Sequence, residues 1–159
     1  MATPQSNPVQ LNETPDVVTW PEKNYVFIEK VGPFQTNAPQ AWQEFHQKIP
    51  AIGEHNTITG YFSLYNVEKQ IYRAGVSVAA EPKDLPSGVK YEKFKGGKYS
   101  RFILTGSYMQ LPDASGRAFH LVHEKKIPLR DDYNIENYVN DPRTTSEDQL
   151  ITEIMFPTK

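Results

Sequence analysis

The chain has 159 residues, with 17 Lys and Arg against 19 Asp and Glu, so its formal charge is −2. This length suits one domain, and the near-neutral charge disfavours a protein that follows phosphate backbones. The sequence contains no cysteine, which excludes disulfides, thiolate nucleophiles and cysteine-ligated metals, and its 12% of aromatic residues among 38% hydrophobic ones is typical of a ring-lined pocket.

The first fourteen residues contain Pro and Asn and few large apolar side chains. We expect them to form a flexible tail before a single folded domain over residues 15–159. The opening residues lack a basic segment followed by an apolar one, and no later stretch approaches eighteen apolar residues. We therefore expect a cytoplasmic protein that does not insert into a membrane.

Four runs of β-branched and aromatic residues predict strands in the first half of the chain. They cover residues 16–20, 25–31, 58–65 and 71–80. Between the second and third runs, apolar residues recur at helical spacing. This spacing predicts an amphipathic helix that Thr36 or Asn37 caps and that Pro50 ends. The Pro-containing and Gly-containing segment 81–88 is a connector.

The second half repeats this order after a shift of 74 residues. The shift places Tyr99 on Tyr25, Gly106 on Gly32, Tyr108 on Phe34, and Phe119 and His120 on Phe45 and His46. The predicted helices end with the same tripeptide, at Lys48-Ile49-Pro50 and Lys126-Ile127-Pro128, with one extra turn in the second. Strands over 133–138 and 149–156 complete this half.

The halves, about residues 24–81 and 89–157, therefore predict two βαββ units and an α+β fold. Their sheets would pack about a pseudo-two-fold axis. A ligand cleft is expected where the two halves meet.

Two carboxylates stand out in the last two predicted strands. Glu136 shares a strand face with Asn134 and Tyr138, and Glu153 lies between Ile151 and Met155 on a second strand face. A carboxylate among apolar neighbours is costly unless it is paired, protonated or reserved for a cationic ligand. For Glu153 a solvated face is the alternative, because the opposite face of that strand is more apolar.

Two C-terminal segments resemble the GyrI-like small-molecule-binding family, also known as the effector-binding domain of bacterial multidrug-sensing and AraC-type transcription regulators. They are Ile135-Glu136-Asn137-Tyr138-Val139-Asn140-Asp141-Pro142 and the segment from Thr144 to Pro157. The resemblance extends upstream through segments 31–34, 59–61, 98–102 and 105–108 and through Trp42. It implies a duplicated βαββ unit with a curved, half-barrel-like antiparallel sheet, two helices and a central ligand cleft.

The resemblance also implies a ligand: an amphipathic, often cationic, aromatic compound held among rings above an acidic residue. That acidic position corresponds to Glu136, and a second carboxylate of the resemblance corresponds to Glu153, with Met155 beside it as a further candidate contact. The rings at cleft positions are Phe34, Trp42, Tyr61, Tyr108, Phe119 and Tyr138. Trp42 and Phe119 lie at helical core spacing, so a structural role is the alternative for each.

Regulators of this class add a helix-turn-helix module, for which the residues before Val17 are too few, so we expect a stand-alone member. Stand-alone relatives include protein inhibitors, ligand sinks and hydrolases of strained small molecules. In a hydrolase, Glu136 would be the general base that activates water. The favoured hypothesis is a small-molecule binder; the alternatives are such a hydrolase and an inhibitor of a partner protein.

The segment from Lys90 to Arg101 interleaves basic residues with rings, as single-strand binding proteins do. Its alternation, however, puts rings on both faces, and Gly96-Gly97 predicts a β-hairpin. His120 and His123 are three residues apart without the spacing of a zinc-protease motif. We therefore expect no direct contact with nucleic acid, no metal and no cofactor.

Overall fold

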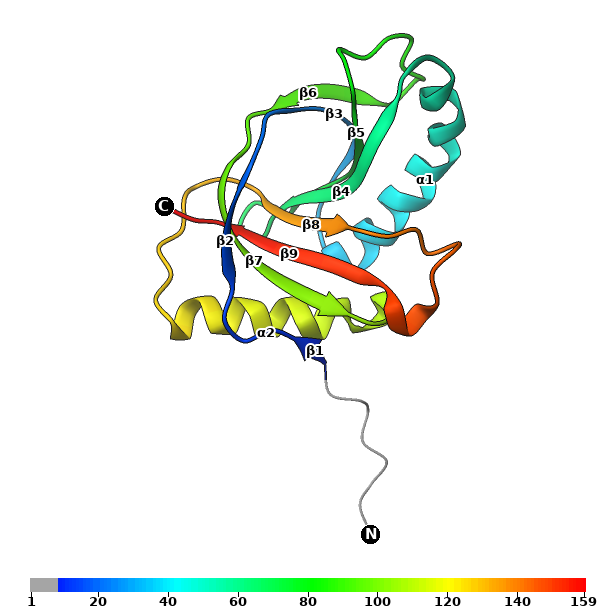
Figure 1. The fold of residues 1–159 in the computed structure, drawn as a ribbon. Coiled ribbons are helices and arrows are strands. Elements are labelled where there is room, and N and C mark those ends of the chain that lie inside the picture. Colours follow the sequence, from blue (N-terminus) through cyan, green and yellow to red (C-terminus); the bar gives the residue numbers. More distant parts are fainter. Residues whose placement is uncertain (1–8) are drawn as a thin grey trace.

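The computed structural model describes residues 9–159. They form a nine-stranded antiparallel sheet that carries two α-helices (Figure 1). The strands are β1 (Gln10–Leu11), β2 (Asp16–Trp20), β3 (Lys23–Val31), β4 (Ile58–Asn66), β5 (Ile71–Val78), β6 (Lys90–Phe94), β7 (Gly97–Thr105), β8 (Asn134–Tyr138) and β9 (Ile151–Pro157). The helices are α1 (Phe34–His55) and α2 (Leu111–Glu124), and short 3₁₀ turns η1 (Tyr108–Gln110) and η2 (Glu147–Gln149) precede α2 and β9. Neither α-helix of the described part is apolar enough over sufficient length to cross a membrane.

The sheet has the strand order β1-β7-β9-β8-β4-β5-β3-β6, with β2 also paired to β7. Each half of the chain follows the order strand, helix, strand, strand, and β4 and β8 join the halves at the centre. Gly32 and Gly106 follow the first strand of each half with nearly the same φ, +133° and +131°. The predicted α+β fold is confirmed; that the halves arose by duplication stays a prediction from the sequence.

Strand alternation gives the sheet two different faces. On one face, α1 packs over β3 and β5 through residues such as Phe45 and Ile52. On the same face, α2 packs over β7 and β9 through residues such as Ala118. The other face buries an aromatic core that includes Tyr25 and Tyr99. The two helices thus cover the outer strands of each half.

The boundaries of both helices differ from the prediction. Helix α1 begins at Phe34 without a side-chain cap and continues through Pro50 to His55. Pro50 costs one backbone hydrogen bond, but Ile52 beyond it is fully buried in the core, and this packing keeps the last turn helical. Helix α2 ends at Glu124, before the second Lys-Ile-Pro, so the first helix is the longer one.

The predicted hairpin around Gly96-Gly97 is wrong. Strand β6 pairs with β3, whereas β7 pairs with β9, β2 and β1, so the turn carries the chain from one edge of the sheet to the other. Gly96 has φ +77°, and a Cβ there would lie 2.3 Å from the Trp20 carbonyl oxygen. Gly96 therefore permits a close backbone approach and is not part of a two-residue hairpin turn.

Part of the expected tail is ordered. Residues 1–8 lie outside the described residues, but Gln10 and Leu11 form β1 against β7. Val9 and Leu11 pack against the core beneath α2, and Glu13 forms an ion pair with Arg117 on that helix. Two apolar side chains are enough to order this segment, because they pack onto a core that the rest of the chain forms.

Candidate functional site

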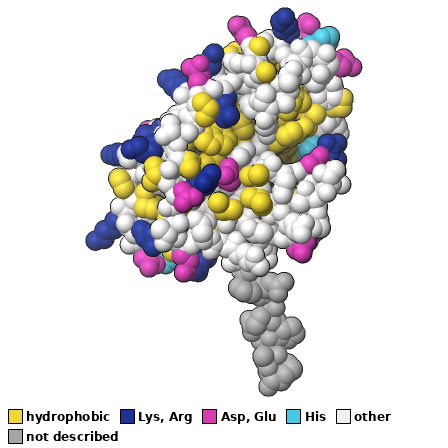
Figure 2. Space-filling view, viewed as in Figure 1, with side chains coloured by type: hydrophobic (Ala, Val, Ile, Leu, Met, Phe, Trp, Pro, Cys, Tyr) yellow, Lys and Arg dark blue, Asp and Glu magenta, His cyan; other side chains and the backbone are white. Residues whose placement is uncertain are grey.

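A cleft of about 1390 Å³ lies between the two helices, above the central strands β4 and β8. It forms because α1 and α2 cover the outer strands and leave the centre of the sheet open (Figure 1). On the face seen in Figure 2, hydrophobic side chains are visible in the middle, while most Lys and Arg side chains lie towards the outline. The lining is mostly apolar and aromatic, as in small-molecule sites.

Three cross-strand pairs build the floor of the cleft. Tyr61 faces Tyr138, Ser63 faces Glu136, and Tyr65 faces Asn134 across the β4–β8 ladder. Residues directly opposite in an antiparallel pair point to the same side, and alternate residues of a strand share a face. One register therefore brings all these side chains to the side that carries the helices.

Glu136 is a half-buried carboxylate in the wall of this cleft. Its Oε1 accepts a 2.9 Å hydrogen bond from the Tyr138 hydroxyl, and among residues 9–159 no Lys, Arg or His forms an ion pair with it. Burial raises the pKa of its carboxyl group, which the nearby hydroxyls of Tyr138 and Ser115 oppose. Glu136 thus holds an acidic group without a cationic partner.

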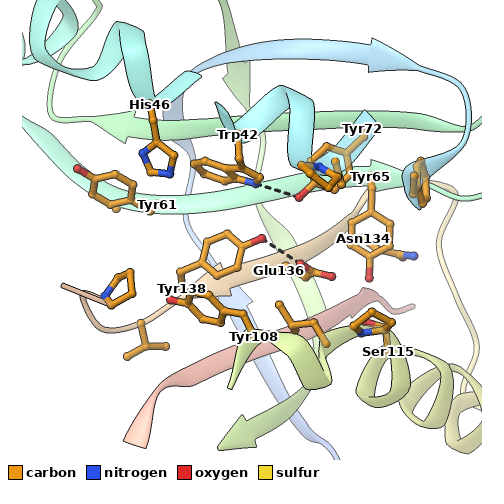
Figure 3. A pocket seen from close by; sticks show the side chains of 18 of the residues that line it. Trp42, His46, Tyr61, Tyr65, Tyr72, Tyr108, Ser115, Asn134, Glu136 and Tyr138 are labelled. Carbon is orange, nitrogen blue, oxygen red and sulfur yellow. Dashed lines mark hydrogen bonds between the residues drawn. The ribbon is translucent and has the colours of Figure 1, made fainter. Parts of the chain in front are cut away.

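A chain of hydrogen bonds leads to this carboxylate, and Figure 3 draws the bond from Trp42 to Tyr72 and the bond from Tyr138 to Glu136. The Trp42 indole donates to Ser63 Oγ at 3.0 Å and to Tyr72 Oη at 2.9 Å. Ser63 Oγ lies 2.7 Å from Tyr72 Oη and 2.9 Å from Tyr138 Oη. Because Tyr138 donates to Glu136, it accepts from Ser63, which in turn accepts from Tyr72. All the donors therefore point along one path towards the carboxylate.

The tyrosines beside Glu136 are neutral at physiological pH. Burial raises the pKa of Tyr72 to about 12 and holds the pKa values of Tyr65 and Tyr138 well above normal. The nearby Glu136 carboxylate raises all three further. Their hydroxyls therefore act as hydrogen-bonding groups and add no charge to the cleft.

Seven of the predicted site residues line the cleft. They are Phe34, Trp42, Tyr61, Tyr108, Phe119, Glu136 and Tyr138. Trp42 also packs against the core, with 5.9 Å between its ring centroid and that of Phe45. Phe119 is 44% exposed and packs against His123 at 4.4 Å between centroids, so it lies outside the core.

The structure does not bring Glu153 and Met155 to the cleft. Strand alternation directs both to the opposite face of β9, where Glu153 accepts hydrogen bonds from Arg101 at 3.0 Å and Asn137 at 2.8 Å. Met155 is fully buried in the aromatic core of that face. We therefore do not propose either as a ligand contact.

The sequence analysis missed several polar residues of the site. Ser63 and Tyr65 follow Tyr61 at every second position, so strand alternation would have added them to the same face. Tyr72 faces Tyr65 across the β4–β5 ladder. Ser115 has no comparable signal, because it reaches the cleft only through the packing of α2.

The histidines do not form a metal centre in the described part of the chain, where no three His, Asp or Glu residues are close enough to hold an ion. His120 instead pairs with Glu124 one turn later on the surface of α2, at 3.1 Å. His46 lines the cleft beside Trp42, with 5.5 Å between ring centroids.

A curved antiparallel sheet with two helices and a ring-lined cleft between them defines a small-molecule-binding domain. The family model of the GyrI-like small molecule binding domain matches residues 13–159, and the chain belongs to this family. A comparison with curated protein sequences finds no significant match.

Solved structures share the fold at low sequence identity. The EcmrR C-terminal domain superposes with a TM-score of 0.75 at 17% identity, covering 95% of this chain and 98% of that one. The chain spans 57% of the EcmrR chain solved in a complex with DNA. SAV2435 bound to tetraphenylphosphonium gives a TM-score of 0.67 at 17% identity, covering 91% of this chain and 93% of the other. A hydrolase from Listeria innocua gives 0.57 at 13% identity, covering 92% of each chain.

Proposed function

We propose that this protein binds amphipathic cations that carry aromatic groups, with Glu136 as the counter-charge in the cleft. The observation that supports it most is the carboxylate itself, which lies among rings without a basic partner in residues 9–159. Burial of an unpaired carboxylate is unfavourable, and a bound cation would offset that cost.

The rings of the cleft supply a second attraction. A cation over the face of an aromatic ring gains about 0.5–2 kcal/mol, more where water is excluded. Trp42 and Tyr138 lie at 5.5 Å between centroids and nearly perpendicular, so two ring planes border the region of Glu136. The tetraphenylphosphonium bound to SAV2435 is a cation of the proposed kind.

The size of the cleft bears on how many different ligands the protein can bind. Its volume of about 1390 Å³ exceeds the range of about 300–1,000 Å³ that is usual for sites of drug-sized ligands. A cleft of this size with mostly apolar walls admits ligands of different shapes. We therefore propose binding of several such compounds and not of one.

The test is isothermal titration calorimetry of tetraphenylphosphonium against the wild-type protein and Glu136→Gln. We expect the variant to bind this cation at least about tenfold more weakly, since the substitution removes the charge and keeps the shape. Triphenylphosphine oxide, a neutral ligand with similar rings, should lose no affinity on this substitution.

Glu68→Gln, which removes an exposed carboxylate in the turn between β4 and β5, is the matched control and should bind the cation as the wild type does. Equal affinity of wild type and Glu136→Gln for tetraphenylphosphonium would refute the proposal.

The hydrolytic alternative is not favoured. The likeness to a hydrolase at 13% identity concerns the fold alone. Binding to a partner protein, the absence of direct nucleic-acid contacts and a cytoplasmic location stay predictions from the sequence.

A further inference from the structure

One end of the cleft is more polar than the rest. Tyr65 and Asn134 face each other across the β4–β8 ladder, and Asn134 precedes Glu136 by two residues on the same face. Ser115 reaches this end from α2. Figure 3 shows these side chains around the Glu136 carboxylate, on the side away from Tyr61 and His46.

These polar groups lack partners within residues 9–159. The Ser115 hydroxyl is shielded from solvent and has no partner at full hydrogen-bond geometry, although it is near enough to Glu136 and Tyr65 to oppose the rise that burial causes in the pKa of each. The amide of Asn134, the hydroxyl of Tyr65 and the second oxygen of Glu136 also have no hydrogen bond in the described part of the chain. Of these groups the Ser115 hydroxyl is shielded from solvent without a partner, and the others are open to the cleft, where a ligand can pair them.

Ser115 lies close to the other groups. Its hydroxyl opposes the rise that burial causes in the pKa of the Glu136 carboxyl and in the pKa of the Tyr65 hydroxyl. On the opposite wall the polar groups are paired, because Trp42, Ser63 and Tyr72 form hydrogen bonds with one another. Unpaired acceptors within residues 9–159 therefore lie around Glu136 on the side of Asn134 and α2, and the Tyr108 hydroxyl beside Tyr138 is a further one.

We infer that the site beside Glu136 prefers a cationic group that carries N–H donors, as a protonated amine or amidine does, over a quaternary onium centre of the same size. This inference rests on the proposed function and narrows its ligand class. A primary ammonium has three N–H donors. The Glu136 carboxylate, the Asn134 amide oxygen and the hydroxyl oxygen of Tyr65 or Ser115 are acceptors for them.

A site made only of rings and one carboxylate would favour the opposite choice. A quaternary ammonium is easier to remove from water than a protonated amine, because it makes no hydrogen bonds to water. A preference for the protonated amine therefore requires acceptors in the protein. The aromatic part of the ligand would lie against Trp42 and Tyr138, with its N–H group towards Asn134.

A matched pair of probes tests this inference by calorimetry. Biphenyl-4-ylmethylammonium and its N,N,N-trimethyl analogue have the same charge and the same rings and differ only in N–H donors. We expect the wild-type protein to bind the primary ammonium about tenfold more tightly, the size expected for hydrogen bonds to a charged group.

Two variants identify the acceptors. Ser115→Ala and Asn134→Ala should each reduce the preference for the primary ammonium several-fold and leave the affinity for the trimethyl analogue unchanged. Ala is favourable in a helix, so Ser115→Ala should fold. Ser87→Ala, an exposed serine in the connector after β5, is the control and should keep the full preference.

Equal or tighter binding of the trimethyl analogue by the wild type would overturn the inference, as would a preference that both variants retain. The proposed function has its own outcome. If Glu136→Gln still weakens the binding of both probes in that case, the cleft binds cations but does not distinguish those with N–H groups from those without.

Discussion

The Tyr138 hydroxyl donates a 2.9 Å hydrogen bond to Oε1 of Glu136, two residues earlier on the same face of β8. This short link joins the carboxylate to Ser63, Tyr72 and Trp42. The orientation of the counter-charge thus depends on side chains from β4, β5 and α1 as well as on its own strand.

Tyr138→Phe should weaken binding of tetraphenylphosphonium several-fold while keeping the ring in place. The substitution removes the donor that favours the ionised carboxylate, so the pKa of Glu136 should rise further above normal. Calorimetry at pH 6 and pH 8 measures the effect, which should be larger at pH 6. Tyr61→Phe, which changes another tyrosine of the floor, is the comparison, since Tyr61 has no hydrogen bond to Glu136 in residues 9–159. An equal loss in both variants would contradict this account.

Ser63→Ala should destabilise the protein by about 1–3 kcal/mol. Ser63 is fully buried, and its hydroxyl contacts Trp42, Tyr72 and Tyr138, which would lose a buried partner. Urea unfolding gives the free-energy difference. Ser77→Ala is the control, because Ser77 is also buried but its hydroxyl bonds only to Thr59 Oγ1 within the described residues, and it should cost less. A larger loss for Ser77→Ala would show that Ser63 is not the centre of the network.

Binding of tetraphenylphosphonium should weaken as the pH is lowered. The pKa of Glu136 is raised above its ordinary 4.5, so the carboxylate takes up a proton, and loses its charge, at a pH above that value. The neighbouring Tyr65, Tyr72 and Tyr138 stay neutral over this range because their pKa values are raised.

Calorimetry between pH 4.5 and pH 8 follows this change, and Glu136→Gln should remove it. His46 also lines the cleft, so His46→Gln is measured in parallel and should retain the pH dependence. A pH dependence that survives in Glu136→Gln would assign the titration to another group.

Gly75→Ala should prevent folding or destabilise the protein severely. A Cβ at this position of β5 would lie 2.3 Å from the Val26 carbonyl oxygen and 2.7 Å from the Tyr25 ring, and neither can move without opening the β3–β5 ladder. Gly116→Ala is the matched control in the middle of α2, where a Cβ meets nothing within 4 Å. We expect it to stabilise the protein by about 0.5–1 kcal/mol, measured by thermal unfolding. Normal stability of Gly75→Ala would show that the paired strands β3 and β5 leave room for a methyl group at this position.

Local patterns in the sequence determined most of the elements and part of the site. Alternation in β8 placed Glu136 and Tyr138 on one face, and the recurrence of Gly32 at Gly106 marked equivalent turns in the two halves. These features depend on residues near one another in the chain, so a period of two or a glycine at a strand end is enough to indicate them.

Long-range packing decided the rest. Ile52 keeps α1 helical beyond Pro50, and Glu153 meets Arg101 on the face away from the cleft, which no local pattern distinguished. Ser115 joins Glu136 only because α2 and β8 fold against the same side of the sheet. The sequence by itself determined that a carboxylate would lie beside rings; the tertiary structure decided which polar groups surround it, because those groups come from strands and a helix that are distant along the chain.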